Sequence, residues 1–223
     1  MKTTTPLLPL HLAFLIFALG ASGQGAFRNL NFEQATIVPS GPGQPLPLVV
    51  ASSALPFWTA YIGSMPMSDI LYDDLTIGSP AVSIHDGGSP FRLPLDGNYS
   101  VVIQHSSGGN PASASIGQVG QLPGNALSLV FDTVNFQNLL VTFDGNPVPL
   151  VQIGSTAHFS VLAGDISSYA GQTGELLFTG LSISGVALDD IRFSTTAVPE
   201  PSTLAFFGLA GILYWLYRSR RVQ

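Results

Sequence analysis

Short apolar or alternating runs, broken at close intervals by glycine, proline, asparagine and aspartate, constrain this chain more than any other feature. Helical periodicity is almost absent between residues 24 and 197. In residues 126–132, Leu127, Leu129 and Phe131 occupy alternate positions, which places one face of an extended strand inward. Short strands separated by frequent turn residues are typical of a β-sandwich, so we expect an all-β fold.

The expected strands follow these runs and are 27–32, 57–62, 70–77, 81–84, 99–104, 113–119, 126–132, 139–143, 148–153, 158–162, 175–179 and 186–193. The runs 139–143 and 148–153 flank Asp144-Gly145-Asn146-Pro147, and Asp-Gly supplies the positive φ that a tight hairpin needs. We therefore predict a hairpin there. The segments 38–47 and 106–111 are rich in glycine, proline, serine or asparagine and are expected to be exposed loops.

The first 23 residues have the three regions of a secretory signal peptide. They contain Lys2, an apolar run at 7–19, and small residues that end at Gly23. We expect cleavage after Gly23. A retained N-terminal anchor is the alternative, but the apolar run is short for one and the small-residue site follows it directly.

The last residues, 198–223, also form a segment distinct from the domain. Pro199 and Pro201 disfavour helical backbone, so a helix can start only at about Ser202 or Thr203. Residues 204–217 carry no charge, and as a helix they would reach only about 21 Å of the ~30 Å hydrocarbon core. The arginines that follow are expected to stay cytoplasmic. An ordinary tail anchor is one interpretation, and a transient signal is the other.

Residues 24–197 are left as one domain, in which acidic residues far outnumber basic ones. Three arginines stand against twelve acidic residues, with no lysine, so the net charge is −9. Such a surface repels phosphate backbones, which argues against nucleic-acid binding, and it attracts cations. The chain has no cysteine, which excludes disulfides, thiol chemistry and cysteine-ligated zinc or iron–sulfur sites.

The order of parts at the C-terminus resembles the PEP-CTERM sorting signal of bacterial exported proteins, which an exosortase recognises and cuts. Its motif is Val198-Pro199-Glu200-Pro201, its apolar helix follows, and its membrane stop is Arg218, Arg220 and Arg221. The resemblance implies the secretion machinery and an exosortase as partners. It also implies transient residence in the inner membrane and delivery to the cell surface or extracellular matrix.

Several motifs of the domain together resemble the galactose-binding-like jelly rolls of carbohydrate-binding modules. They include Asn29-Leu30-Asn31-Phe32-Glu33, Trp58 in an early position, Asp96-Gly97-Asn98-Tyr99-Ser100-Val101 and Leu188-Asp189-Asp190-Ile191. The resemblance implies a jelly-roll β-sandwich and a structural Ca²⁺ held by Glu33 and one or both of Asp189 and Asp190. The competing interpretation is that Glu33 and Asp190 are merely exposed strand residues.

The sequence contains little that points to catalysis. His85, His105 and His158 lack metal-binding spacing, His85-Asp86 is interpreted as a polar turn, and no serine lies in a Gly-x-Ser-x-Gly elbow. We therefore predict that the protein is not an enzyme and has no catalytic residues.

Sugar binding has more support, because amphipathic aromatic side chains can stack on sugar rings. The candidates are Trp58, Tyr61, Tyr72 and Tyr99, and core packing is the competing interpretation for each. The leading hypothesis is an exported, surface-sorted β-sandwich that binds or organises extracellular polysaccharide. A glycan-processing enzyme and a purely structural spacer are the alternatives.

Overall fold

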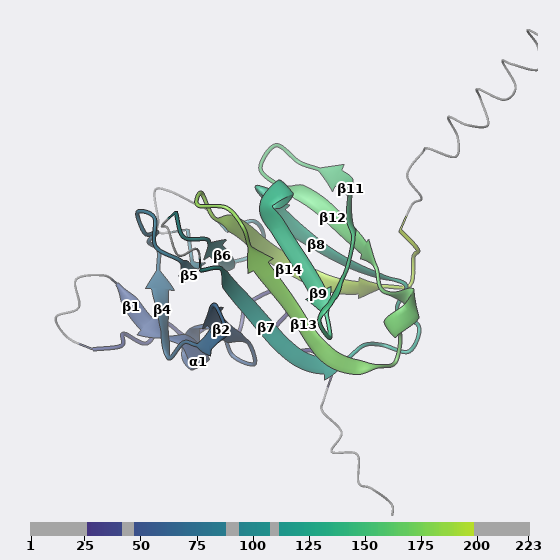
Figure 1. The fold of residues 1–223 in the computed structure, drawn as a ribbon, viewed down its shortest axis with the longest axis horizontal. Helices are drawn as coiled ribbons and strands as arrows, with labels where there is room; N and C mark the ends of the chain where they lie inside the picture. The colour runs from purple at the N-terminus through teal and green to yellow at the C-terminus, as the bar shows by residue number, and fades with distance from the viewer. Residues whose placement is uncertain (1–25, 42–46, 88–93, 108–111, 199–223) are drawn as a thin grey trace, which may run out of the picture.

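The computed structural model describes residues 26–41, 47–87, 94–107 and 112–198, which form two β-sheets packed face to face (Figure 1). The predicted signal peptide and nearly all of the C-terminal segment lie outside the described residues. The elements in chain order are β1 (Leu48–Val50), α1 (Ala51–Ala54), β2 (Thr59–Ile62), β3 (Met65–Pro66), β4 (Asp69–Tyr72), β5 (Ala81–His85), β6 (Ser100–Gln104), β7 (Ala114–Gln121), β8 (Ser128–Val134), η1 (Phe136–Asn138), β9 (Leu139–Phe143), β10 (Asn146–Pro147), β11 (Leu150–Ser155), β12 (Ser160–Asp165), η2 (Ser167–Tyr169), β13 (Thr173–Gly180) and β14 (Val186–Ser194).

One sheet has eight strands in the order β1-β4-β5-β6-β14-β8-β12-β11, and the other has six in the order β10-β9-β13-β7-β2-β3. Among the described strands, only β4 and β5 pair in parallel. Strands far apart in sequence are neighbours in both sheets, as when β14 lies between β6 and β8. The predicted all-β sandwich is confirmed.

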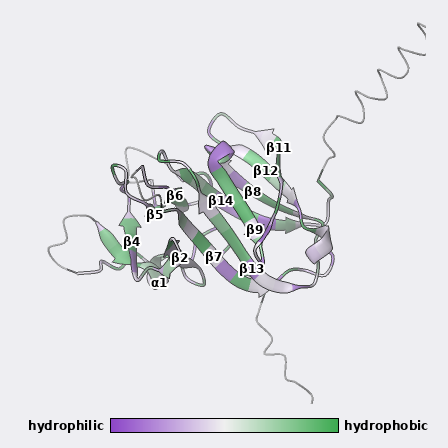
Figure 2. Cartoon of the chain, in the orientation of Figure 1, coloured by the Kyte–Doolittle hydropathy of each residue, from purple (hydrophilic) through white to green (hydrophobic). Residues whose placement is uncertain are grey.

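The core fills the space between the two sheets because alternate residues of each strand point inward. In β13, Gly174, Leu176, Phe178 and Gly180 are buried, whereas the residues between them are not. Figure 2 shows apolar positions along the strands of both sheets. Trp58 lies among them, with its ring centre 5.8 Å from that of Phe32 and 6.1 Å from that of Phe178. Burying an aromatic side chain of this kind contributes about 1.5–3 kcal/mol.

Most predicted strands are present, with boundaries that move by one to three residues, but the strand predicted at 70–77 ends at Tyr72 in β4. Strand β8 spans Ser128–Val134 rather than 126–132, so Leu127 lies before the strand and is 36% exposed. Leu129 and Phe131 face the core as predicted. His85, interpreted above as part of a polar turn, is instead the last residue of β5 and is fully buried.

The predicted hairpin turn is confirmed. Asp144 and Gly145 have φ values of 48° and 76°, and Asn146 pairs with Phe143 across the turn. The prediction that residues 148–153 form its second strand is wrong. After Val148 donates a hydrogen bond to Val141 O, the chain crosses to the other sheet, where β11 pairs with β12. Prolines at 147 and 149 lack the N–H groups that would continue the ladder.

The predicted strand 27–32 is also wrong, because this segment forms a tight turn. Asn29 and Phe32 have φ values of 50° and 58°, and Phe32 is fully buried. The Asn29 backbone oxygen accepts a hydrogen bond from Trp58 Nε1 at 2.9 Å. Leu30 O accepts one from Ile191 N at 2.9 Å. The turn therefore joins the beginning of the domain to its last strand.

Candidate functional site

Two of the predicted calcium ligands, Glu33 and Asp189, converge on one short loop. Glu33 Oε1 accepts hydrogen bonds from the backbone N–H groups of Asn98 and Tyr99 at 2.7 and 2.9 Å, and Glu33 Oε2 accepts one from Asn98 Nδ2 at 2.7 Å. Asp189 Oδ2 accepts a hydrogen bond from Asp96 N at 3.0 Å. The loop 96–99 thus connects the N-terminal turn to β14.

The two carboxylates have opposite pKa shifts. Burial raises the pKa of Asp189 to about 7, and the negative charges of Asp96 and Glu33 contribute. Burial acts in the same direction on Glu33, but hydrogen bonds from Asn98 and Tyr99 outweigh it and hold the pKa below its usual value. Asp189 is therefore a buried acid beside other acids, whereas loop N–H groups stabilise the ionised form of Glu33.

The third predicted ligand, Asp190, has a cationic side chain as its partner. Its φ is 42°, where the pairing of β14 with β8 shifts register, and its carboxylate pairs with Arg192. Arg192 also lies 3.9 Å from Asp132 Oδ1. Burial raises the pKa of Asp132 to about 6, although Arg192 partly opposes this shift.

These positions fit a cation only in part. Within the described residues, no three acidic or histidine side chains come together closely enough to hold a metal ion. Each ionised carboxylate of Glu33 and Asp189 retains acceptor capacity beyond the N–H groups it binds. Asp132 Oδ1 is buried without a hydrogen-bond partner in the described part of the chain. The junction therefore holds Asp189 as a buried acid whose ionised form a cation would stabilise.

The four aromatic candidates lie in different environments. Trp58 is 5% exposed, and its indole N–H is bound, so core packing is the correct interpretation for this residue. Tyr99 and Tyr72 are partly buried against the core, and the Tyr72 hydroxyl donates to Asp86. Tyr61 lies on the outer face of β2 in the six-stranded sheet, because its neighbour Ala60 faces the core. Of the four, Tyr61 is the best placed to meet a ligand.

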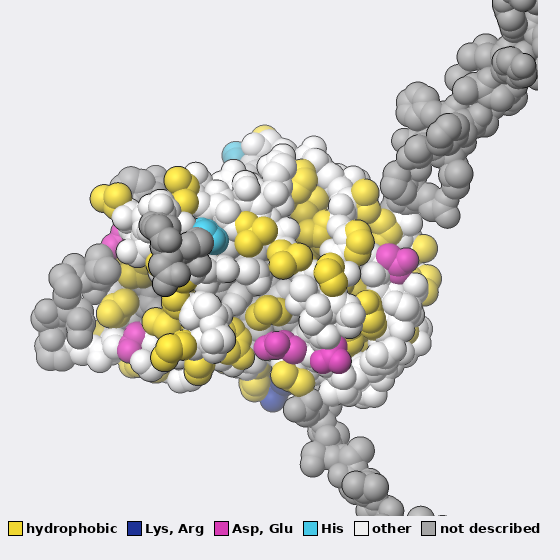
Figure 3. All heavy atoms as spheres, in the orientation of Figure 1, with side chains coloured by type: hydrophobic (Ala, Val, Ile, Leu, Met, Phe, Trp, Pro, Cys, Tyr) yellow, Lys and Arg dark blue, Asp and Glu magenta, His cyan; other side chains and the backbone are white. Residues whose placement is uncertain are grey.

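The outer face of the six-stranded sheet forms a broad surface around Tyr61. Register places Tyr61, Ser115, Thr179 and Leu140 in one row across β2, β7, β13 and β9, and Thr59, Gly117, Leu177 and Thr142 in the next. We call these residues, with Glu175, the Tyr61 face. Figure 3 shows apolar side chains over β9 and β13 with acidic ones beside them.

Gly117, at the centre of this face, lets two neighbouring side chains pack close over the backbone. A Cβ there would lie 2.8 Å from Glu175 Oε1 and 3.0 Å from Leu177 Cδ1, so both side chains lean over the glycine. The Tyr61 hydroxyl lies 3.4 Å from Glu175 Oε1. Sequence reasoning identified Tyr61 but not Glu175, because only strand pairing brings the two side chains together.

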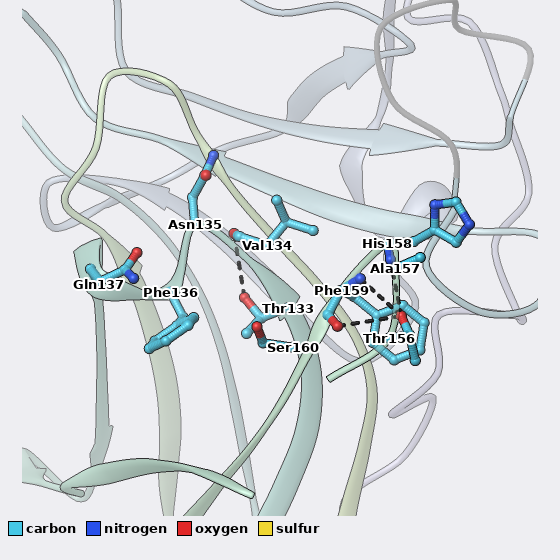
Figure 4. A pocket seen from close by; sticks show the side chains of 10 residues that line it. All are labelled: Thr133, Val134, Asn135, Phe136, Gln137, Thr156, Ala157, His158, Phe159 and Ser160. Atoms are coloured by element: carbon cyan, nitrogen blue, oxygen red, sulfur yellow. Dashed lines mark hydrogen bonds between the residues drawn. The ribbon is translucent and has the colours of Figure 1, made fainter. Parts of the chain in front are cut away.

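A second recess, missed by the sequence analysis, lies at one end of the sandwich (Figure 4). It has a volume of about 310 Å³ and lies between the segment that joins β8 to η1 and the tip of the β11–β12 hairpin. Phe136 and Phe159 stand on either side of Thr133 and Ser160. The lining residues come from two segments that no local pattern connects.

A group of polar residues lies at the end of β4 and β5. His85 Nδ1 is 3.6 Å from Asp73 Oδ1, and Asp86 N donates a hydrogen bond to the same oxygen. Burial raises the pKa of Asp73 to about 6, and a hydrogen bond with Asp86 contributes. This arrangement joins Asp73, His85 and Asp86 in one network.

The domain is anchored close to the sorting segment. Leu127 N donates to Ser194 O at 2.8 Å, and Ser128 Oγ donates to Thr196 O at 2.7 Å. Val198 is the last described residue, so Pro199, Glu200, Pro201 and the terminal arginines lie outside. Among the residues that the structure describes, no helix has the length and apolar character needed to cross a membrane.

Solved structures with some likeness to this chain belong to several classes of protein. The enzymatically active domain of tailspike protein 4 from bacteriophage CBA120 is 19% identical, with 62% of this chain and 19% of that chain covered and a TM-score of 0.38. A cyclase from Fischerella sp. TAU is 16% identical, with 77% and 96% covered and a TM-score of 0.40. The family 11 carbohydrate-binding module of a Clostridium thermocellum cellulosomal cellulase is 11% identical, with 74% and 97% covered and a TM-score of 0.34.

At these TM-scores, none of the three likenesses supports a conclusion about the activity of this chain. No curated protein has a matching sequence. The C-terminal segment, in contrast, does match a known motif. Residues 197–221 match the PEP-CTERM protein-sorting motif, which confirms the resemblance and indicates an exported protein that an exosortase sorts to the cell surface.

Proposed function

We propose that this protein is a surface or matrix protein whose β-sandwich binds extracellular polysaccharide on the Tyr61 face, without catalysing a reaction. The observation that carries the proposal is the arrangement of Tyr61, Gly117 and Glu175. The Tyr61 hydroxyl lies 3.4 Å from a Glu175 carboxylate oxygen, and the Glu175 and Leu177 side chains lie low over Gly117, which leaves the sheet surface beside the ring flat. A sugar ring needs an apolar surface to stack on and a polar group beside it.

The shape and chemistry of the face support a polymer rather than a small charged ligand. The two rows cross four strands, and because neighbouring strands lie about 4.8 Å apart, the face is roughly 15 Å wide. Its rows contain threonine hydroxyls and leucine side chains. Threonine hydroxyls can donate and accept hydrogen bonds with sugar hydroxyls, and leucine methyl groups can contact sugar C–H groups.

A glycan-processing enzyme remains the alternative function. Hydrolysis of a glycosidic bond requires two carboxyl groups roughly 5 to 10 Å apart across the bond. Glu175 supplies one carboxylate beside Tyr61. The proposal therefore predicts that polysaccharides bind to the protein and that no reducing ends are released from them.

Affinity electrophoresis against a panel of polysaccharides tests the proposal. Tyr61→Ala should weaken retention by about fivefold or more, because loss of an aromatic contact costs about 1 kcal/mol or more. Glu175→Gln should weaken it less. Ile153→Ala is the matched control, since Ile153 is 44% exposed on β11 in the other sheet. Equal retention of Tyr61→Ala and the parent chain would leave the structural spacer as the better account.

We also propose that Ca²⁺ binds at the junction of the N-terminal turn and β14. Glu33 and Asp189 would supply carboxylate oxygens, and Asp190 would not take part because it pairs with Arg192. Backbone carbonyls or water would complete the six to eight oxygens that Ca²⁺ requires. The ion would supply positive charge where a buried acid has a raised pKa. In a domain without disulfides, it would hold the chain ends together.

A further inference from the structure

The recess at the end of the sandwich has an unusual lining for such an acidic domain. The ten residues that line it are Thr133, Val134, Asn135, Phe136, Gln137, Thr156, Ala157, His158, Phe159 and Ser160, and no aspartate, glutamate, lysine or arginine occurs among them. Phe136, which also packs against the core, and Phe159 are seen on either side of Thr133 and Ser160, a pair across β8 and β12 (Figure 4). The recess is lined by aromatic rings, hydroxyl groups and amides.

Hydrogen bonds fix the two segments that form the walls. Asn135 adopts φ 64° and donates from Nδ2 to Gly185 O at 3.0 Å, which sets the position of η1 and its first residue, Phe136. On the other side, Thr156 Oγ1 accepts hydrogen bonds from the N–H groups of His158 and Phe159, each at 3.1 Å. The aromatic walls are thus held before any ligand arrives, which lowers the entropy cost of binding.

From this arrangement we infer that the recess binds a single neutral sugar ring, as found at the end or on a branch of a polysaccharide. Ligand pockets have volumes of roughly 300 to 1,000 Å³, so a recess of about 310 Å³ accommodates one ring. Phe136 and Phe159 would contact the C–H faces of the ring, and the Gln137 amide and His158 imidazole would bind its hydroxyls. The uncharged lining offers no counter-charge to an acidic sugar.

The inference goes beyond the proposed function, because this recess is separate from the Tyr61 face. Its walls come from the β8–η1 connection and from the β11–β12 hairpin, and both β11 and β12 belong to the eight-stranded sheet. The Tyr61 face belongs to the six-stranded sheet. A protein with both sites would bind one polymer along its length and another at its end, and would thereby join polysaccharide chains.

Saturation-transfer NMR on the full chain, kept in solution with a detergent that contains no sugar, tests the inference. The probes are the methyl glycosides of glucose, galactose and mannose, with the methyl glycoside of glucuronic acid as the charged comparison. At least one neutral glycoside should bind, and the glucuronide should bind more weakly than its glucose counterpart. Phe159→Ala should weaken binding of the neutral glycoside by about tenfold or more.

Two further variants separate the recess from other causes. Phe159→Leu keeps an apolar side chain but removes the flat ring, so it should stay folded by circular dichroism and still lose binding. Tyr61→Ala should retain the part of glycoside binding that Phe159→Leu removes, which distinguishes this site from the Tyr61 face. The inference is overturned if no neutral glycoside binds, if folded Phe159→Leu binds like the parent chain, or if the glucuronide binds as tightly as the glucoside.

Discussion

At the scale of single residues, Asp189 has the pKa shift that most affects how the stability of this domain depends on pH. It is 1% exposed, and burial raises its pKa to about 7. An unfolded aspartate has a pKa of about 3.9. As pH rises between these values, the unfolded chain loses the proton first, so the folded state becomes relatively less stable. Asp132, whose pKa is raised to about 6, acts in the same direction.

The first prediction follows from this sign. With chelator present, the free energy of unfolding of the domain 24–197 should fall as pH rises from about 4 to about 7 and then level off, with a change on the order of a few kcal/mol. Asp189→Asn should remove most of this slope. Urea titrations across the pH range measure it. Asp165→Asn is the control, because hydrogen bonds from Ser167 lower the pKa of Asp165 and its contribution has the opposite sign.

Residue identities were easier to predict than their environments. The sequence identified Asn29 and Glu33 as parts of one motif, but it predicted a strand where Asn29 and Phe32 adopt positive φ. Amphipathic aromatics look alike in sequence, so Trp58 in the core and Tyr61 on the outer face are both candidates from sequence, although the apolar run around Trp58 favours burial. What separates them is the direction of each side chain from its sheet, which depends on long-range pairing.

At the scale of elements, the β9–β10 hairpin shows how two residues determine a turn. Asp144 and Gly145 both have positive φ, which matches the twist of the adjoining strands. A Cβ on Gly145 would meet no atom within 4 Å, so only backbone conformation opposes a larger residue there. This makes the position a clean test of backbone strain.

Gly145→Ala should therefore reduce the free energy of unfolding by about 1 kcal/mol, because a non-glycine residue is disfavoured at positive φ. Gly154→Ala is the matched control, since its Cβ would make ordinary contact with Val161 at 3.6 Å. The control should change stability by less than about 0.5 kcal/mol. Denaturant titrations of both variants measure the two changes in the free energy of unfolding. Equal changes would show that the positive φ of Gly145 does not affect stability.

Alternation predicts strands well but does not predict which sheet a strand joins. Residues 148–155 illustrate this, because the chain leaves one sheet after Val148 and pairs in the other from Leu150. Alternation also assigns Ser83 and His85 to a solvent-facing side, yet both are fully buried. Loops cover that side of the sheet. One of them is the loop 96–99, in which Asp96 N donates a hydrogen bond to Asp189. Such coverage depends on contacts between distant segments that no local pattern contains.

At the scale of the whole molecule, the folded domain and the sorting motif are almost contiguous. Thr196 is bound to Ser128, and the match to the sorting motif begins at residue 197. Glu200 lies four residues beyond Thr196 and outside the predicted sandwich. A change at Glu200 should therefore affect sorting without affecting the fold.

We predict that the mature protein lacks the apolar segment 204–217. Intact-mass analysis of protein from the native host tests this prediction.

We also predict that Glu200→Ala leaves a folded but mislocalised domain. Cell fractionation tests this second prediction. Stability should change by less than about 0.5 kcal/mol. Asp165→Ala, an exposed acid within the domain, should be delivered normally. Recovery of the protein with its tail attached, or normal delivery of Glu200→Ala, would support an ordinary tail anchor.

The last prediction concerns the proposed Ca²⁺ and the whole domain, because its site connects the N-terminal turn to the final strand. Ile191 N already binds Leu30 O, and loop 96–99 contacts both Glu33 and Asp189. An ion bound only to the folded state should add about 2.7 kcal/mol at a hundredfold excess over its dissociation constant. Thermal melts of the domain 24–197 with Ca²⁺ and with chelator measure this increment.

Glu33→Gln should lose most of the Ca²⁺-dependent increment, because a neutral amide is a weaker calcium ligand than a carboxylate. Asp190→Asn should keep it, since Asp190 pairs with Arg192 and lies outside the proposed ligand set. This pair of variants separates a specific ion site from general screening of the acidic surface, which would affect both equally. Identical melting temperatures with Ca²⁺ and with chelator, together with no calcium by elemental analysis, would show that hydrogen bonds alone hold the junction.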